Sequence, residues 1–261
     1  MKVAEVKFTN YAENVKKALD AVHADKVLKE QAAIIIKPNL LGPQPPPVTT
    51  PIECCDAVLD YVRACSDANV VVAEGCGDPD MDTHEVFVEL GYADWAAEKG
   101  IHLIDLNDAP LEWRENPDCE MFPEISLPEI AFTHYIISVP VLKAHTLSTI
   151  TGTLKNMMGF APPRYYSGGR LGCWKKAVFH ENLEQAITDL NRYRTPDLTL
   201  MDASIGLAES HLGGPECDPP VGKILASFDP VELDRRAAGL LGFDWLQIGH
   251  LNADIEEDQN D

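Results

Sequence analysis

A chain of 261 residues, 45% of them hydrophobic, is long enough for one large domain or two modest ones around a real core. Its formal net charge of -21 repels nucleic-acid phosphates and anionic lipid, so composition argues against both as general partners. The opening MKVAEVKF lacks the apolar core of a signal peptide, and no run approaches the roughly 18 apolar residues of a membrane span. We therefore expect a cytoplasmic protein that binds neither nucleic acid nor membrane.

Apolar runs that indicate strands alternate with amphipathic stretches along the chain, which is typical of an α/β fold with a mostly parallel, doubly wound sheet flanked by helices. The expected strands span residues 3–8, 32–37, 69–74, 101–106, 135–143, 197–202 and 223–229. Apolar residues at i, i+3, i+4 and i+7 predict helices over 15–22 and 183–190. A short helix is also expected at LKNMMG, residues 154–159.

Three further helix starts carry capping signals. Thr50, Asp82 and Asp229 each stand three residues before a glutamate, which predicts a capping box at each position. We expect residues 1–261 to form a single domain, with two lobes as the alternative. The polar, proline-punctuated segment 107–128 is then an excursion or a lobe boundary, and the acidic residues 254–261 are a solvated tail.

The seven cysteines form no C-x-x-C pair, so the spacing indicates neither a disulfide framework nor a zinc ribbon, and the chain has no iron–sulfur motif. A dinucleotide fingerprint is also incomplete, because Asp80 stands where the third glycine after Gly75 and Gly77 belongs. No G-x-x-x-x-G-K-[ST] run is present. The cofactor is therefore unknown, and a bound metal stays an open alternative.

The charge pattern departs from the chain average in one segment. No Asp or Glu occurs from Ala131 to His180, although about eight would be expected at the chain-wide frequency of 42 in 261. Six basic residues fall inside this acid-free segment: Lys143, Lys155, Arg164, Arg170, Lys175 and Lys176. Such a pattern inside an acidic protein predicts a binding site for a small anion.

Several expected strands end in an ionisable residue, among them Lys37, Lys143 and Asp202. Because ligands bind at the carboxyl ends of parallel strands, we expect these three residues near one edge of the sheet. Lys143 and His145 are two apart and would point to the same side of an extended chain. Hydroxyls, including that of Thr151, precede the short helix that carries Lys155 and Asn156, and its N-terminus is expected to seat an anion. His180 is a candidate acid, base or metal ligand.

Five blocks together resemble the family called domain of unknown function 362: IIIKPNLLG, VPVLKAH with TGTLKNMMG, FHENLEQAITDL, PDLTLMDASIG and ILASFDPVELDRRAAGLLG. The resemblance implies functional roles for ten residues: Lys37, Asn39, Lys143, His145, Lys155, Asn156, His180, Asp202, Asp229 and Asp234. It also implies iron–sulfur surroundings, with a ferredoxin-like protein as partner. Glu209, followed by SHLGGP with His211, replaces the family's compact glycine-rich turn, so the local ligand there is expected to differ. The Lys, His and Lys layout is similar, by analogy alone, to that of nickel-pincer lactate racemases.

These patterns lead to two hypotheses. The first is an enzyme that binds a small carboxylate or phosphate metabolite through Lys37, Lys143 and Lys155. In it, His145 and His180 move a proton in a racemase, isomerase or lyase reaction, and nearby lysines keep His145 neutral so that it can act as a base. The second is a non-catalytic accessory protein for an iron–sulfur redox partner, which holds a metal or cofactor through His145, His180 and either Cys173 or Asp202.

Overall fold

The computed structural model describes residues 3–168 and 175–253. Arg170, Cys173 and the acidic tail 254–261, which the sequence singled out, lie outside the described residues. Within the described part, nine strands form one mixed sheet and two more form a small second sheet. The strands are β1 (Ala4–Lys7), β2 (Ala33–Pro38), β3 (Asn69–Glu74), β4 (His102–Asp105), β5 (Leu111–Glu115), β6 (Glu124–Pro128), β7 (Tyr135–Val139), β8 (Val141–His145), β9 (Thr149–Thr151), β10 (Leu198–Leu207) and β11 (Lys223–Ser227).

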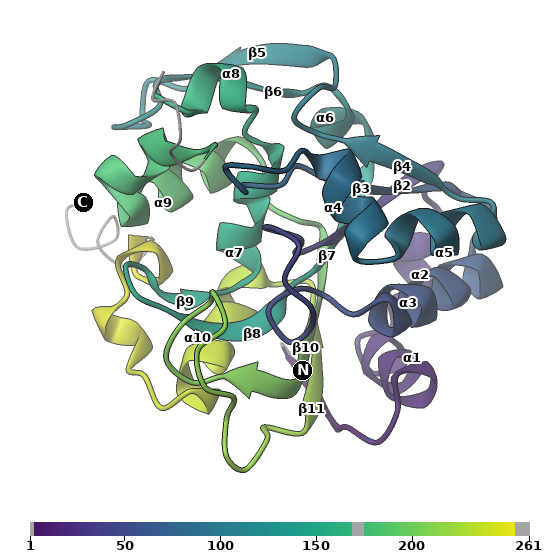
Figure 1. Cartoon of the computed structure of the whole chain (residues 1–261). Coiled ribbons are helices and arrows are strands. Elements are labelled where there is room, and N and C mark those ends of the chain that lie inside the picture. The colour runs from purple at the N-terminus through teal and green to yellow at the C-terminus, as the bar shows by residue number, and fades with distance from the viewer. Residues whose placement is uncertain (1–2, 169–174, 254–261) are drawn as a thin grey trace.

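The main sheet has the order β1-β11-β10-β7-β2-β3-β4, and β8 leaves this path to pair with β10 and β9. The pairs from β10 through β7, β2 and β3 to β4 are parallel, while β11 is antiparallel to both β1 and β10. The expected α/β architecture with parallel central strands is therefore confirmed. The carboxyl ends of β2, β3 and β7 lie at one edge of this sheet (Figure 1).

Helices cover the sheet on both sides (Figure 1). The α-helices are α1 (Tyr11–Ala21), α2 (Asp25–Leu28), α3 (Ile52–Cys65), α4 (Thr83–Glu89), α5 (Tyr92–Lys99), α6 (Ile130–Thr133), α7 (Thr153–Asn156), α8 (Pro163–Tyr166), α9 (Leu183–Tyr193) and α10 (Pro230–Leu240). Four short 3₁₀ helices are described as well: η1 (Met157–Phe160), η2 (Ala177–Glu181), η3 (Trp245–Gln247) and η4 (Gly249–Leu251). No helix among the described residues is long and apolar enough to cross a membrane.

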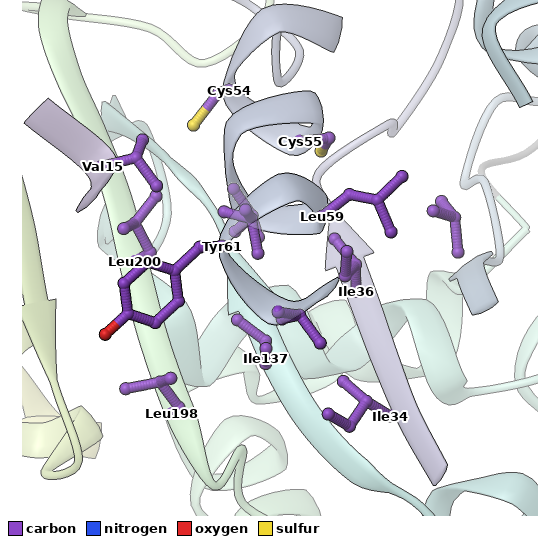
Figure 2. Close-up of a cluster of buried hydrophobic side chains, with 14 of the residues drawn as sticks. Val15, Ile34, Ile36, Cys54, Cys55, Leu59, Tyr61, Ile137, Leu198 and Leu200 are labelled. Atoms are coloured by element: carbon purple, nitrogen blue, oxygen red, sulfur yellow. The ribbon is translucent and has the colours of Figure 1, made fainter. Parts of the chain in front are cut away.

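Alternation along β2 divides the core between the two faces. Ile34 and Ile36 point toward α1 and α3, together with Ile137, Leu198 and Leu200 (Figure 2). Ile35, between them, joins the cluster under α7 and α9 on the opposite face. Because successive side chains of a strand alternate, Lys37 follows Ile35 onto this second face, and there it packs beside Phe160.

Two local expectations, at 135–143 and at Thr50, differ from the structure. The run 135–143 is two strands, since Pro140 has no N–H for the ladder and the chain bends there. Thr50 caps no helix, because its Oγ1 donates to Val139 O (2.7 Å), although Asp82 forms the expected capping box and Asp229 caps α10. The segment 107–128 contains the β5–β6 hairpin, which packs on the second face through Phe122.

Candidate functional site

A cavity of about 320 Å³ opens beside the carboxyl ends of β2 and β3. This volume lies at the lower end of the range of small-molecule sites, ~300–1,000 Å³. Six of the twelve residues that the sequence or the family resemblance assigned to the site line it: Asn39, His145, Thr151, Lys155, Asn156 and His180. The other six, Lys37, Lys143, Asp202, Glu209, Asp229 and Asp234, are not among its lining residues. The acid-free segment thus supplies most of the predicted cavity wall.

Lys37 forms a buried ion pair with Glu74, a residue that itself lines the cavity. Its Nζ lies 2.8 Å from Glu74 Oε1 and also donates to Pro38 O (3.2 Å). Glu74 accepts two backbone N–H groups in addition, from Gly75 (2.8 Å) and Leu40 (3.0 Å). Burial lowers the pKa of Lys37, and the adjacent Glu74 carboxylate opposes that shift. Lys37 is therefore matched within the protein and is not available to hold an anion, contrary to expectation.

Gly159 explains how this pair can lie so close to η1. A Cβ at Gly159 would stand 2.1 Å from Glu74 Oε1 and 2.5 Å from Lys37 Nζ, distances that real Cβ atoms do not reach. Only a residue without a side chain fits here. The Met-Met-Gly turn of the acid-free segment is thereby fixed against the ends of β2 and β3.

Lys143 is likewise occupied, through a network of amides. Its Nζ donates to Asn39 Oδ1 (2.5 Å) and Val48 O (2.6 Å), so Asn39 Nδ2 is left to donate to Asn156 Oδ1 (3.1 Å). Asn156 also accepts from Lys37 Nζ (3.3 Å), so the two lysines lie on either side of one Asn–Asn pair, close together as expected for these two residues. Burial, and secondarily the charge of Lys155, lowers the pKa of Lys143 to about 7. Lys143 therefore orients the amides instead of facing a ligand.

Lys176 was counted in the acid-free segment but not assigned to the site, and it does line the cavity. Its three N–H donors go to Asn107 Oδ1 (3.1 Å), Met158 O (3.0 Å) and Gly159 O (2.9 Å). Burial lowers its pKa to about 7, against the opposing charge of Glu74. Lys176 adds positive potential to the cavity, but its donors are already used.

Lys155 differs from the other three lysines. Among the described residues, no group makes a hydrogen bond or ion pair with its Nζ, although it lines the cavity. Burial lowers its pKa to about 8, so at pH 7 it remains mostly protonated. A partly buried ammonium without an acceptor is costly. Lys155 is therefore the cation in this part of the chain that most requires an anionic partner.

The start of α7 is not the anion seat that the sequence predicted. Asp234, from α10, accepts hydrogen bonds there from Thr153 N (2.7 Å) and Leu154 N (3.0 Å). Gly152 makes room for it, since a Cβ would stand 2.3 Å from the carboxylate. Burial raises the pKa of Asp234 to about 6. An internal carboxylate thus fills the position expected for a ligand, and it fixes the helix that carries Lys155.

His145 has its ring orientation and proton set by the backbone. Its Nδ1 accepts hydrogen bonds from Leu147 N (3.0 Å) and Ser148 N (3.2 Å). A nitrogen that accepts from two N–H groups cannot carry a proton, so neutral His145 holds its proton on Nε2. Burial, followed by the charge of Lys155, lowers its pKa far below the usual range. The neutral state is as expected, but the role of base is not supported, because Nε2 is a donor.

His211 stacks on His145, with ring centroids 3.8 Å apart and planes inclined by 21°. Its Nδ1 is buried and has no hydrogen-bond partner, and the same holds for Thr151 Oγ1. Both residues line the cavity. Burial lowers the pKa of His211 to about 3, with Lys155 as the next cause. Two buried polar groups without partners beside an unmatched ammonium indicate a polar ligand.

His180, on η2, completes the group of three histidines. Burial and the Lys155 charge lower its pKa, while the backbone carbonyls of Lys176 and Ala177 oppose this. His180 and His145 are therefore both neutral at pH 7, and His145 offers its Nε2–H as a donor.

Two predicted residues do not reach the cavity. Asp202 accepts from Tyr11 OH (2.9 Å) and Ser204 N (2.8 Å), because it follows Leu198 and Leu200 on the face toward α1. Glu209 is exposed in the loop after β10, and its neighbour His211 lines the cavity instead. The described residues contain no group of three or more His, Cys, Asp or Glu placed to hold a metal ion. The ligand set of His145, His180 and Asp202 is therefore not assembled.

Sequence reasoning left Glu74, Lys176 and His211 without a role in the site. Glu74 ends a buried strand, as Lys37 does, and this shared position was the available signal for their pairing. Nothing local in the sequence distinguishes Lys176 from Lys175, which instead donates to Met81 O. His211 was noted for its glycine-containing loop, and only the fold shows its stacking on His145.

The sequence matches a family model, and the fold is similar to that of a solved structure. A family model described as Domain of unknown function (DUF362) matches residues 34–239, so the chain belongs to this uncharacterised family. The solved structure of the lactate racemase apoprotein from Thermoanaerobacterium thermosaccharolyticum is similar in fold, with a TM-score of 0.53 and 12% identity. The match covers 87% of this chain but 54% of that one, so the chain spans about half of the racemase. No curated protein matches the sequence.

Proposed function

We propose that this protein is an enzyme that binds a small organic carboxylate in the cavity and moves a proton at the carbon next to it, as in a racemase, isomerase or lyase. The observation that carries the proposal is Lys155, a cavity-lining ammonium with no partner among the described residues. The racemase-like fold supports the same reaction class only weakly, because folds host many chemistries.

Lys155 supplies a positive charge and a hydrogen bond from its Nζ to the carboxylate of the ligand. An ion pair formed in a partly buried site is stronger than one in water. The helix that carries Lys155 is fixed by Asp234, so little ordering remains to be done when the ligand binds. Thr151 Oγ1 and His211 Nδ1, both without partners, are available for a second polar group of the ligand.

His180 is the base in this proposal, and His145 is the donor. Removal of a proton beside a carboxylate moves an electron pair onto the carboxylate oxygens, which then carry more negative charge. His145 Nε2–H donates to one of these oxygens, and Lys155 offsets the charge, so both act where charge develops. His180 takes the proton on a ring nitrogen and returns it to the same carbon, and return after the planar intermediate has turned its other face to His180 inverts the centre.

Exchange of the abstracted proton with solvent tests this function. The protein is incubated in D₂O with a panel of 2-hydroxy, 2-amino and 2-oxo acids, and loss of the signal of the proton next to the carboxylate is followed by ¹H NMR. We expect exchange with at least one class of acid. The exchange rate should be lower by about 100-fold or more in His180→Gln. Lys26→Ala, at an exposed lysine on α2, is the control and should not change the rate. Exchange in none of the classes, or equal exchange in His180→Gln, would contradict the proposal.

A further inference from the structure

Two leucines with unusual exposure stand in the wall of the cavity. Leu147 is 61% exposed and Leu212 is 42% exposed, yet both line it. Leu147 lies in the turn between β8 and β9, and Leu212 lies in the loop between β10 and β11. The protein thus leaves apolar surface uncovered on two separate loops beside its unmatched cation.

These two loops are joined by the histidine stack. His145 and His211, at 3.8 Å between ring centroids, lie two residues before Leu147 and one residue before Leu212. The backbone N–H of Leu147 is itself held by His145 Nδ1 (3.0 Å). The two leucines are therefore placed by the same contacts that orient the polar groups, which is what a built specificity surface requires.

Volume and charge restrict what can fill this space. At ~30 Å³ for each water in the liquid, a cavity of about 320 Å³ holds on the order of ten waters. Acetate or inorganic phosphate would leave most of that space to water. Among the described lysines that line the cavity, Lys155 is the one with free donors, because those of Lys176 are used. The cavity suits one negative charge attached to an apolar body better than a multiply charged phosphate.

We infer that the ligand is a monocarboxylate with an apolar chain, and that Leu147 and Leu212 select for that chain by covering it. This inference rests on the proposed function, because it takes the carboxylate at Lys155 as given. Leu41 and Met158, which also line the cavity, extend the apolar wall. Burying one methylene contributes about 0.8 kcal/mol, which corresponds to about fourfold tighter binding for each carbon that the leucines cover.

Isothermal titration with acetate, butanoate, hexanoate and inorganic phosphate tests the inference on the whole chain. We expect hexanoate to bind at least about tenfold more tightly than acetate, and phosphate to bind more weakly than hexanoate. Leu147→Ser and Leu212→Ser should each remove much of the gain with chain length while acetate binding is kept. Leu246→Ser, at a leucine 55% exposed on η3 and absent from the cavity wall, is the matched control and should keep the full gain.

The outcomes separate this inference from the function on which it rests. Carboxylates that bind with equal affinity at every chain length, or phosphate that binds best, would overturn the selection by Leu147 and Leu212 and leave the carboxylate site standing. Binding of no carboxylate at all would overturn both. A loss of acetate binding in the serine variants would show that the leucines support the fold of the site and do not select the chain.

Discussion

Lys37 and Lys155 lie on the same side of the sheet, but their surroundings are opposite. Lys37 is fully buried and matched by Glu74, two backbone N–H donors to that carboxylate, and Asn156. Lys155 is less buried and has no partner in the described part of the chain. A buried charge that is matched inside the protein belongs to the scaffold, whereas an unmatched charge in a cavity indicates a ligand.

The largest expected effect comes from breaking the matched pair. Lys37→Met should lower the free energy of unfolding by about 3–5 kcal/mol, because it leaves the Glu74 carboxylate buried without its cation. Urea denaturation measures this. Lys155→Met, at the lysine that does line the cavity, is the control and should not destabilise the protein. A loss below about 1 kcal/mol in Lys37→Met would mean that the Glu74 site does not depend on the ion pair.

Removing the internal anion at α7 should have the next largest effect. Asp234→Ala leaves the N–H groups of Thr153 and Leu154 buried without acceptors, and we expect a loss of about 2–3 kcal/mol. Asp229→Ala removes an ordinary helix cap and should cost only about 1 kcal/mol. Equal losses of unfolding free energy in the two variants would show that the Asp234 hydrogen bonds stabilise the protein no more than an ordinary helix cap does.

The pH dependence of stability sharpens the same point. Burial raises the folded-state pKa of Asp234 to about 6, above the ordinary value of 3.8 in the unfolded chain. The folded protein therefore binds this proton more tightly than the unfolded chain does. The stability that this difference in pKa contributes is fully present below about pH 4 and is lost as pH rises through about 6. The stability of the wild type relative to Asp234→Asn should fall from pH 4 to pH 7. A difference that stays constant over that range would contradict the raised pKa.

A smaller effect is expected on the pH dependence of carboxylate binding. The pKa of Lys155 is lowered to about 8, so the empty site is mostly charged at pH 7 and loses its charge above pH 8. A bound carboxylate raises that pKa, so binding above pH 8 must take up a proton. Hexanoate affinity should be flat from pH 6.5 to 7.5 and fall by up to about tenfold per pH unit above 8. Titration in buffers of different ionisation enthalpy detects the proton uptake directly.

The sequence predicted the sheet well because its signals are local. Strands such as 69–74 combine β-branched residues with abrupt ends, and parallel pairing follows from the helices between them. The β5–β6 hairpin and the three-residue β9 were not predicted, since their partly exposed residues show little alternation. The hydroxyls of β9 instead suggested a loop around an anion.

The site was predicted in part, for a physical reason. The carboxylate-free residues 131–180 do bring Lys155, His145 and His180 to the cavity wall, while anion binding there stays a prediction. A local sequence pattern cannot show that a carboxylate far away in the chain pairs with a lysine or accepts from a helix N-terminus. Glu74 is 37 residues from Lys37, and Asp234 is 80 residues from Leu154. Asp202 was misplaced because its strand continues to Leu207 and its side chain points to the other face, where Tyr11 donates to it.

The most direct test of the central claim compares thermal unfolding of the wild type and Lys155→Met at pH 7, each with and without a saturating concentration of hexanoate. Lys155→Met removes an unmatched charge, so the Tm of the free variant should equal or exceed that of the wild type. Hexanoate at about 100 times its Kd contributes about 2.7 kcal/mol and should raise the Tm of the wild type by about 5 °C or more. It should leave the Tm of Lys155→Met unchanged. An equal rise in both proteins would contradict the account, because the carboxylate would then bind without the cavity-lining lysine that has no partner among the described residues.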